Sequence, residues 1–314
     1  MINFAVDYYL KILFLTNYFY PHVGGVEKHV HEIGRKLSDK NQKITIITEK
    51  FDKKLKNEEI VQGIKVVRFT YPHTKFLGLV SIWFWLLKNR NLIEQADVIQ
   101  CHDVFIWYLP FRFLYPNKPV YTTFHGWEEV YPIPRKNIFL KRLAQKLSFG
   151  TIAVGKYIEK YYGIKANKIT YGAAKNISTP THKENNKIVY VGRLDKNTGL
   201  LKFLRWLKEN KKYSVDFCGD GNLRRECKKY GTIYGFTDPG PFYQKAQLCV
   251  PGGYLSALEA LNYNCQIKLF WDNKVKEDYW KMSPFVKKDA VSWAKEQTWG
   301  KLANEYLDLY NSTK

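Results

Sequence analysis

Short runs rich in β-branched residues alternate along most of the chain with stretches of helical periodicity, and this alternation limits the possible folds. The first unit has a strand at Lys11–Thr16, a helix near Val26–Ser38 and a strand at Ile44–Thr48. This order predicts parallel strands joined by a right-handed crossover. Further strands are expected at Ile64–Phe69, Asp97–Cys101, Val120–Phe124 and Thr151–Val154. The N-terminal part therefore predicts one doubly wound α/β sheet.

A second α/β unit follows a small, polar segment at Gly172–Asn186 that is typical of a connection between domains. Strands are expected again at Lys187–Val191, Ser214–Cys218 and Gln247–Val250. The length of 314 residues also exceeds what one hydrophobic core usually organises. We expect domains at residues 1–172 and 173–290. Because ligands of parallel sheets bind beyond the carboxyl ends of the strands, the functional cleft should lie between them.

The charge of the chain is strongly positive, with 50 Lys and Arg against 29 Asp and Glu, a formal net charge of +21. This field favours anionic partners such as phosphorylated substrates, nucleic acid or an acidic membrane surface. The basic residues are spread from Lys11 to Lys314 without a run of five, so we expect no nucleic-acid partner.

The cysteine pattern and the apolar segments predict a cytoplasmic chain. Five cysteines without a C-x-x-C pair predict neither a disulfide framework nor a zinc site. The apolar N-terminus lacks a basic start and is interrupted by Asp7 and Lys11, so it is not interpreted as a signal peptide. Phe76–Leu87 is too short to span a bilayer, for which a helix needs roughly 20 residues. With Lys88 and Arg90 after it, this segment is either a buried helix or a peripheral contact with the inner membrane face.

Several candidate ligand-binding residues directly follow predicted strands. Gly24-Gly25 would let phosphate oxygens approach a helix N-terminus, or simply form a tight turn. His125 is suited to a substrate hydroxyl, or is a loop histidine without a ligand. Arg193 is suited to a diphosphate, or pairs with Asp195. In the predicted helix Leu255–Leu261, Glu259 could accept hydrogen bonds from two ribose hydroxyls, or lie on a solvated face.

The order of these motifs resembles the retaining glycosyltransferases of family 4, which have the GT-B fold. The resemblance runs from KILFLTNYFYPHVGGVEKHV through DVIQCHD, TTFHG, GRL and GDG to LEAL. It implies two Rossmann-like domains facing across a cleft, with the C-terminal segment 291–314 packing back on the N-terminal domain as a helix. It also implies that a hexose is transferred from a UDP- or GDP-sugar to a glycan or a lipid-linked acceptor.

The resemblance also assigns roles to individual residues. His125 and Arg193 are the catalytic candidates: His125 would contact the transferred sugar, and Arg193 would neutralise the leaving diphosphate. Gly24 and Gly25 would lie against the diphosphate, and Glu259 would hold the ribose. The backbone N–H groups around Gly253, Tyr254 and Leu255 would face sugar or phosphate.

The chain departs from the family pattern at two positions. A glutamate is usual where Pro251 stands, and a lysine is usual at Thr198, for which Lys196 is the expected substitute. No D-x-D pair is present, so we expect no metal and no cofactor besides the donor. The alternatives are a catalytically silent nucleotide-sugar-binding homologue and a transferase that glycosylates DNA bases.

Overall fold

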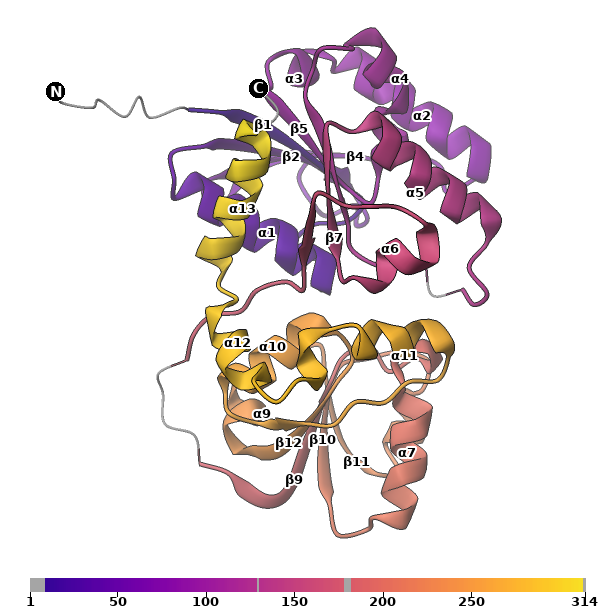
Figure 1. The fold of residues 1–314 in the computed structure, drawn as a ribbon. Helices are drawn as coiled ribbons and strands as arrows, with labels where there is room; N and C mark the ends of the chain where they lie inside the picture. Colours follow the sequence, from indigo (N-terminus) through magenta and orange to yellow (C-terminus); the bar gives the residue numbers. More distant parts are fainter. Residues whose placement is uncertain (1–8, 129, 178–181, 313–314) are drawn as a thin grey trace, which may run out of the picture.

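The structure is a computed structural model that describes residues 9–128, 130–177 and 182–312. Most of the apolar N-terminus (residues 1–8) and part of the expected connection (residues 178–181) lie outside these residues. The described chain forms two α/β domains stacked one above the other (Figure 1). The expected two-domain fold is confirmed.

The N-terminal domain contains an eight-stranded sheet in the order β3-β4-β2-β1-β5-β6-β7-β8. All neighbouring strands are parallel except the pair β3 and β4, which forms a hairpin that the sequence patterns did not predict. The strands are β1 (Lys11–Thr16), β2 (Lys43–Glu49), β3 (Glu58–Val61), β4 (Ile64–Phe69), β5 (Val98–His102), β6 (Val120–Phe124), β7 (Gly150–Val154) and β8 (Lys168–Thr170).

Helices cover both faces of this sheet. Those of this domain are α1 (Gly25–Ser38), α2 (Lys75–Lys88), α3 (Asn91–Glu94), α4 (Phe105–Leu114), α5 (Arg135–Leu147) and α6 (Tyr157–Tyr162). On one face, α4 packs against both α2 and α5, and α5 against α6. The core on this side includes Ile82, Leu86 and Trp107, whereas α1 contributes Val30 and Ile33 to a second core on the other face.

The C-terminal domain has a five-stranded parallel sheet in the order β11-β10-β9-β12-β13. Its strands are β9 (Glu184–Val191), β10 (Ser214–Cys218), β11 (Gly231–Gly235), β12 (Ala246–Pro251) and β13 (Gln266–Ile267). The helices are the 3-10 turns η1 (Lys196–Thr198) and η2 (Pro284–Val286), and α7 (Leu200–Glu209), α8 (Arg224–Cys227), α9 (Gly240–Lys245), α10 (Tyr254–Asn262), α11 (Lys274–Lys281) and α12 (Ala290–Glu296).

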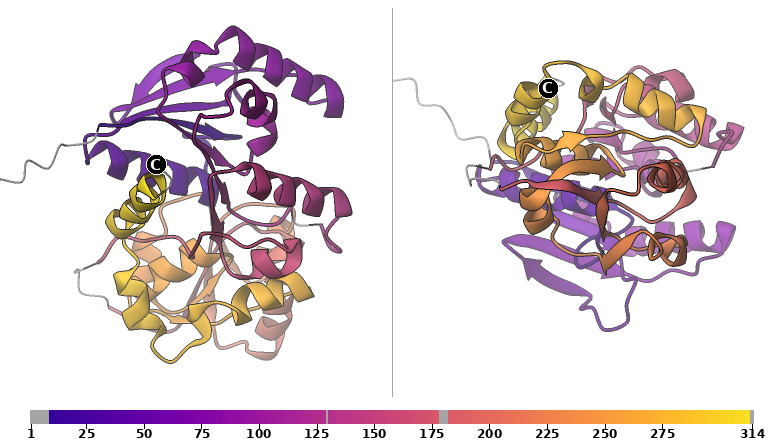
Figure 2. Two further views of the ribbon diagram at one scale, coloured as in Figure 1. Left: turned by 45° about the horizontal axis from the view of Figure 1, so that its top comes forward. Right: turned by 90° about the horizontal axis from the view of Figure 1, so that it is seen from below.

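The last helix, α13 (Trp299–Asn311), returns to the N-terminal domain and packs beside α1, as the left view of Figure 2 shows. The single helix expected over residues 291–314 is interrupted, because α12 ends at Glu296 and Thr298 caps a new helix. The Thr298 side chain accepts a hydrogen bond from the backbone N–H of Lys301. Helix α12 packs on α10, so the crossing between domains occurs at this break.

None of the helices in the described part of the chain is long and apolar enough to cross a membrane.

Candidate active site

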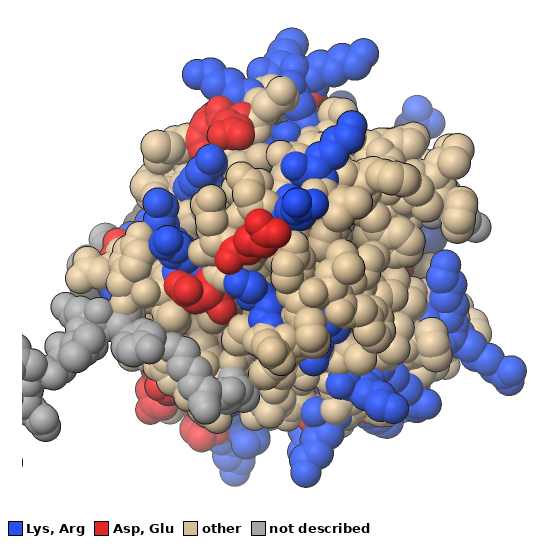
Figure 3. Space-filling model, turned by 90° about the horizontal axis from the view of Figure 1, so that it is seen from above, with Lys and Arg blue, Asp and Glu red and all other residues tan. Residues whose placement is uncertain are grey.

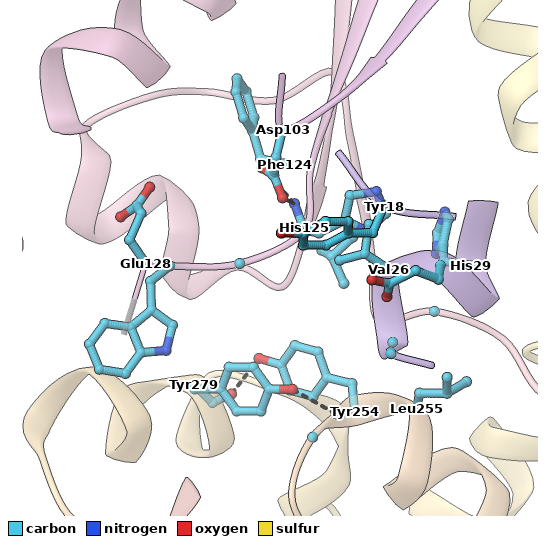
Figure 4. A pocket seen from close by; sticks show the side chains of 18 of the residues that line it. Tyr18, Val26, His29, Asp103, Phe124, His125, Glu128, Tyr254, Leu255 and Tyr279 are labelled. Carbon is cyan, nitrogen blue, oxygen red and sulfur yellow. Dashed lines mark hydrogen bonds between the residues drawn. The ribbon is translucent and has the colours of Figure 1, made fainter. Parts of the chain in front are cut away.

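A cavity of about 760 Å³ lies between the two domains at the carboxyl ends of their parallel strands. Side chains from both domains point into it (Figure 4). Its lining includes most of the residues predicted from the sequence: Gly24, Gly25, His125, Arg193, Gly253, Tyr254 and Leu255. Two predicted residues, Lys196 and Glu259, are absent from the described residues that line it.

His125 directly follows β6, and the groups around it hold it firmly. Its backbone N–H donates to both carboxylate oxygens of Asp103, at 3.2 and 3.1 Å. Asp103 in turn accepts a hydrogen bond from Lys141 Nζ at 3.4 Å. The Nε2 atom of the His125 ring lies 2.9 Å from Nδ1 of His102, at the end of β5. The parallel pairing of β5 and β6 therefore brings these groups to one edge of the sheet.

The environment of His125 keeps its imidazole neutral. Burial, and secondly the nearby Lys141 ammonium, lower the pKa of His125 to about 3. Burial also lowers the pKa values of His29 and His102 well below the usual value. The imidazole of His125 can therefore donate or accept a hydrogen bond at physiological pH without carrying charge.

A buried polar network connects this edge of the sheet to the C-terminal helix. The His29 ring stacks edge-on to that of His125, with centroids 4.6 Å apart. His29 Nε2 lies 2.9 Å from the Tyr306 hydroxyl, which is also 2.8 Å from Oγ1 of Thr123. Tyr306 belongs to α13, so the returning helix supports the residues behind His125 as well as covering the sheet.

The Gly24-Gly25 pair forms the start of α1, and both residues line the cavity. A Cβ atom at Gly24 would collide with the Glu27 carboxylate, whose Oε1 atom lies 2.7 Å from His22 Nδ1. The start of this 14-residue helix therefore lies at the cavity with no side chain at its first two positions and with the Glu27 carboxylate beside it.

Arg193 follows β9 and lies at the cavity. Neither Thr198, where the family pattern has a lysine, nor its expected substitute Lys196 lines the cavity. Thr198 is buried, and its hydroxyl donates to the Asp195 carbonyl at 2.7 Å. A residue at 198 thus points into the domain. Lys196 is exposed in η1, away from the residues that line the cavity.

Lys276 of α11 is a cation at the cavity that the sequence patterns did not reveal. It is buried, and its Nζ atom donates to the Gly252 carbonyl at 2.8 Å. The same ammonium lies 3.9 Å from the centroid of the Tyr279 ring. Asn273 caps this helix by accepting from the Lys276 N–H, and the pattern Asn273-Lys-Val-Lys could have predicted the helix start. The same pattern could not have predicted that the Lys276 side chain points toward the cavity.

The short loop after β12 explains how Lys276 comes so close. Pro251 ends the strand, and Gly252 packs on Gly192 so closely that a Cβ atom on Gly192 would lie 2.8 Å from Gly252 Cα. The position at which the family resemblance implies a glutamate is thus a proline at the end of the strand, followed by the tightly packed backbone of Gly252. Tyr254, which opens α10, is fixed by Tyr279, whose hydroxyl accepts from the Tyr254 N–H at 2.6 Å.

Glu259 lies one turn deeper in α10, where it contacts the other domain. Its Oε1 atom accepts from Lys28 Nζ of α1 at 2.5 Å, and its Oε2 atom accepts from the Tyr243 hydroxyl at 3.4 Å. The side chain of Glu259 is 15% exposed, whereas that of Lys28 is 45% exposed, so water reaches the ion pair from the lysine side. The predicted ribose contact therefore stays a prediction, since Lys28 occupies one of its oxygens.

Other groups at the cavity that sequence reasoning missed include Asp103, Lys141, Tyr279 and His29. His102 is buried behind them and contacts the cavity residue His125. In the part of the chain that the structure describes, no group of three or more His, Cys, Asp or Glu side chains is arranged to hold a metal ion.

The two facing α/β domains and the cavity between them are those of the GT-B fold. Solved structures with this fold cover nearly the whole chain at low identity. Sucrose-phosphate synthase from Thermosynechococcus elongatus has a TM-score of 0.72 at 13% identity, over 96% of this chain and 98% of that one. The Anabaena protein HepE, solved with UDP and glucose, has a TM-score of 0.67 at 13% identity. The match covers 98% of this chain and 100% of HepE.

Residues 23–171 match the family described as Glycosyltransferase Family 4, which is the family that the motifs resemble. The resemblance noted in the sequence is thereby confirmed. The phosphatidylinositol N-acetylglucosaminyltransferase GPI3 subunit of Saccharomyces cerevisiae is 30% identical over 96 residues, which are 29% of this chain and 21% of that protein. Its Schizosaccharomyces pombe counterpart is 22% identical over 104 residues, 29% and 23% respectively. The matched part of the chain thus spans less than a quarter of the length of these curated relatives.

Proposed function

We propose that this chain is a retaining glycosyltransferase that moves a hexose from a nucleotide-diphosphate sugar to an acceptor hydroxyl. The observation that carries the proposal is the composition of the cavity, where cations of the C-terminal domain face a neutral histidine of the N-terminal domain. The donor diphosphate would lie against Arg193 and Lys276, and the sugar would extend toward His125.

The chemistry asked of these residues is mainly electrostatic. As the bond between the sugar C1 atom and the phosphate oxygen breaks, negative charge develops on the departing diphosphate. Arg193 and Lys276 would stabilise that charge, aided by the N–H groups at the start of α1. At the start of α10, the N–H groups of Gly253 and Tyr254 already donate to Ser256 Oγ and the Tyr279 hydroxyl. The acceptor oxygen then forms the new bond to C1 on the same face, and its proton passes to the departing phosphate oxygen.

His125 would recognise the sugar and would not exchange protons with it. Its Nε2 atom is used by His102, so Nδ1 is the ring nitrogen through which a sugar hydroxyl would be bound. A pKa of about 3 makes it a poor general base near neutral pH. Its neutral ring would hydrogen-bond a sugar hydroxyl without placing a positive charge beside the developing oxocarbenium ion.

Similar structures support a uridine nucleotide as the first donor to test. The Anabaena protein HepE was solved with UDP and glucose and also with UDP-glucose. The yeast relatives are named for N-acetylglucosamine transfer to phosphatidylinositol. We therefore rank UDP-glucose and UDP-N-acetylglucosamine ahead of GDP-sugars as donors for this chain.

The test combines a thermal-shift screen of UDP- and GDP-sugars with the rate of donor hydrolysis. We expect one donor to raise the Tm, and Arg193→Ala and Lys276→Ala to reduce its affinity by about tenfold or more. Lys196→Ala is the matched control, because Lys196 is an exposed lysine off the cavity, and it should behave as the wild type. His125→Ala should lower the hydrolysis rate more than donor affinity.

Two results would contradict the proposal. If no nucleotide sugar changes the Tm at millimolar concentration, the chain is not a donor-binding protein of this kind. If a donor binds but neither His125→Ala nor Arg193→Ala changes turnover, the site assignment is wrong. Donor binding with no turnover in the wild type would indicate the catalytically silent homologue.

A further inference from the structure

The outer surface of the N-terminal domain carries large apolar side chains that no other part of the described chain covers. Six of them are between 59% and 75% exposed, and we call them the outer apolar face: Phe76, Leu77 and Phe84 of α2, Phe113 and Leu114 of α4, and Phe139 of α5. The first of these helices is not simply buried, since Ile82 and Leu86 pack inward while the other side stays in water. These helices are neighbours, since α4 packs against both α2 and α5. Large apolar side chains exposed on one group of neighbouring helices are typical of an interaction site.

The charged residues of the three helices that form this face are all basic, and Glu94 of α3, which pairs with Arg90, lies beside the end of α2. None of the three helices contains an Asp or a Glu, whereas each contains Lys or Arg. Exposed basic residues flank the apolar ones, among them Lys88 at the end of α2 and Arg135 and Lys136 at the start of α5. Figure 3 looks onto this end of the domain and shows a broad uncharged area with many projecting Lys and Arg side chains and fewer Asp and Glu side chains around it. Apolar residues bordered by cations complement an anionic lipid surface.

The cavity between the domains extends toward the same three helices. On the side of the N-terminal domain, the cavity is lined by apolar residues of α4 and α5. We call this part of the cavity the apolar arm; its residues are Phe105, Ile106, Leu140, Leu143 and Ala144. The Ile106 carbonyl accepts a hydrogen bond from Trp83 Nε1 of α2 at 2.9 Å, so the arm borders that helix. Phe139, on the outer apolar face, is next to Leu140 of the arm.

We propose that the outer apolar face docks on an anionic bilayer, and that the acceptor is a lipid whose apolar chain lies in the apolar arm. The inference rests on the proposed function, because the arm matters only if a sugar is transferred beside it. An acceptor hydroxyl at His125 and a tail between α4 and α5 would place the polar and apolar parts of an amphiphile in matching surroundings. A water-soluble sugar would leave the arm unfilled.

Docking is tested by sedimentation of the full chain with vesicles. We expect the wild type to bind vesicles of phosphatidylcholine with about 30% phosphatidylglycerol, and to bind pure phosphatidylcholine much less. The double variant Phe76→Ser and Phe84→Ser should reduce the partition coefficient by about tenfold or more. The matched control is Ile60→Ser with Phe236→Ser, which removes equally exposed apolar residues from other surfaces and should bind like the wild type.

Several outcomes would overturn the docking proposal: no binding by the wild type, equal binding by the Phe76 and Phe84 variant, or equal loss in the control. Size-exclusion chromatography without lipid gives a further outcome that would overturn it. If the wild type is a dimer and the Phe76 and Phe84 variant is a monomer, a second copy of the chain covers this face. The donor-induced change in Tm should be the same in both variants. Vesicle binding without any donor effect would therefore refute the transferase and not the docking.

The apolar arm is probed separately with octyl glucoside below its micelle concentration. This amphiphile should raise the Tm of the wild type, whereas glucose at the same concentration should not. Leu140→Glu places a charge in the arm and should abolish the shift while leaving the donor-induced shift unchanged. Equal protection by glucose and octyl glucoside, or an unchanged effect in Leu140→Glu, would refute the assignment of the arm.

Discussion

The buried neutral state of His125 predicts a specific loss of stability in acid. Its pKa is about 3 in the folded chain, because burial and secondly Lys141 oppose the charged form, and about 6.5 in the unfolded chain. The unfolded state therefore binds more protons between these two values. The stabilisation is complete above about pH 6.5 and is lost as the pH falls toward 3.

The size of this effect follows from the difference in pKa. At pH 5 the imidazole is protonated in the unfolded chain and neutral in the folded chain. This pH lies about 1.5 units below the unfolded pKa of about 6.5. At about 1.4 kcal/mol per unit, His125 alone reduces the free energy of unfolding by about 2 kcal/mol between pH 7.5 and pH 5. His29 and His102, whose pKa values burial also lowers, add to this loss in the same direction.

Urea unfolding at the two pH values, followed by tryptophan fluorescence, measures the effect. In His125→Asn the loss between pH 7.5 and pH 5 should be smaller by about 2 kcal/mol than in the wild type. The exposed His182, changed to Asn, is the matched control and should leave the wild-type difference intact. An identical loss in wild type and His125→Asn would refute the reasoning, as would a His125 ring resonance that titrates between pH 6 and 7.

Three further predictions concern contacts elsewhere in the structure. Tyr306→Phe removes the hydroxyl shared by His29 and Thr123 and should cost about 1–3 kcal/mol in urea unfolding, and a loss within error would contradict the network. Gly155→Ala places a Cβ atom 2.7 Å from Tyr254 at a φ of +106°, so the Tm should fall by several degrees, and an unchanged Tm would be inconsistent with this packing. All five cysteines are free and buried, so a thiol reagent should modify none of them in the native chain and all five in urea; rapid native labelling would argue against their burial.

The sequence predicted well those features that depend on local pattern and strand order. Alternating strands and helices implied parallel sheets, and parallel sheets place the residues after each strand at one edge. For that reason the amino-acid pattern alone predicts that Gly24, His125 and Arg193 share a cleft, and the cavity contains all three. The crossing of the last helix came from the family resemblance and is confirmed, although its break at Thr298 was not foreseen.

The remaining features depended on contacts between residues far apart in the chain. Thr198, at the position where the family resemblance implies a lysine, points into the domain. The lysine that lies at the cavity on this side is Lys276, about 80 residues later in the chain. Glu259 is engaged by Lys28 of the other domain. Neither partner carries a sequence signal, because a side chain's direction depends on how its helix packs. The sequence thus determined the fold and the edge where chemistry occurs, whereas only the packing of α11 and α1 across the cleft decided which charges meet there.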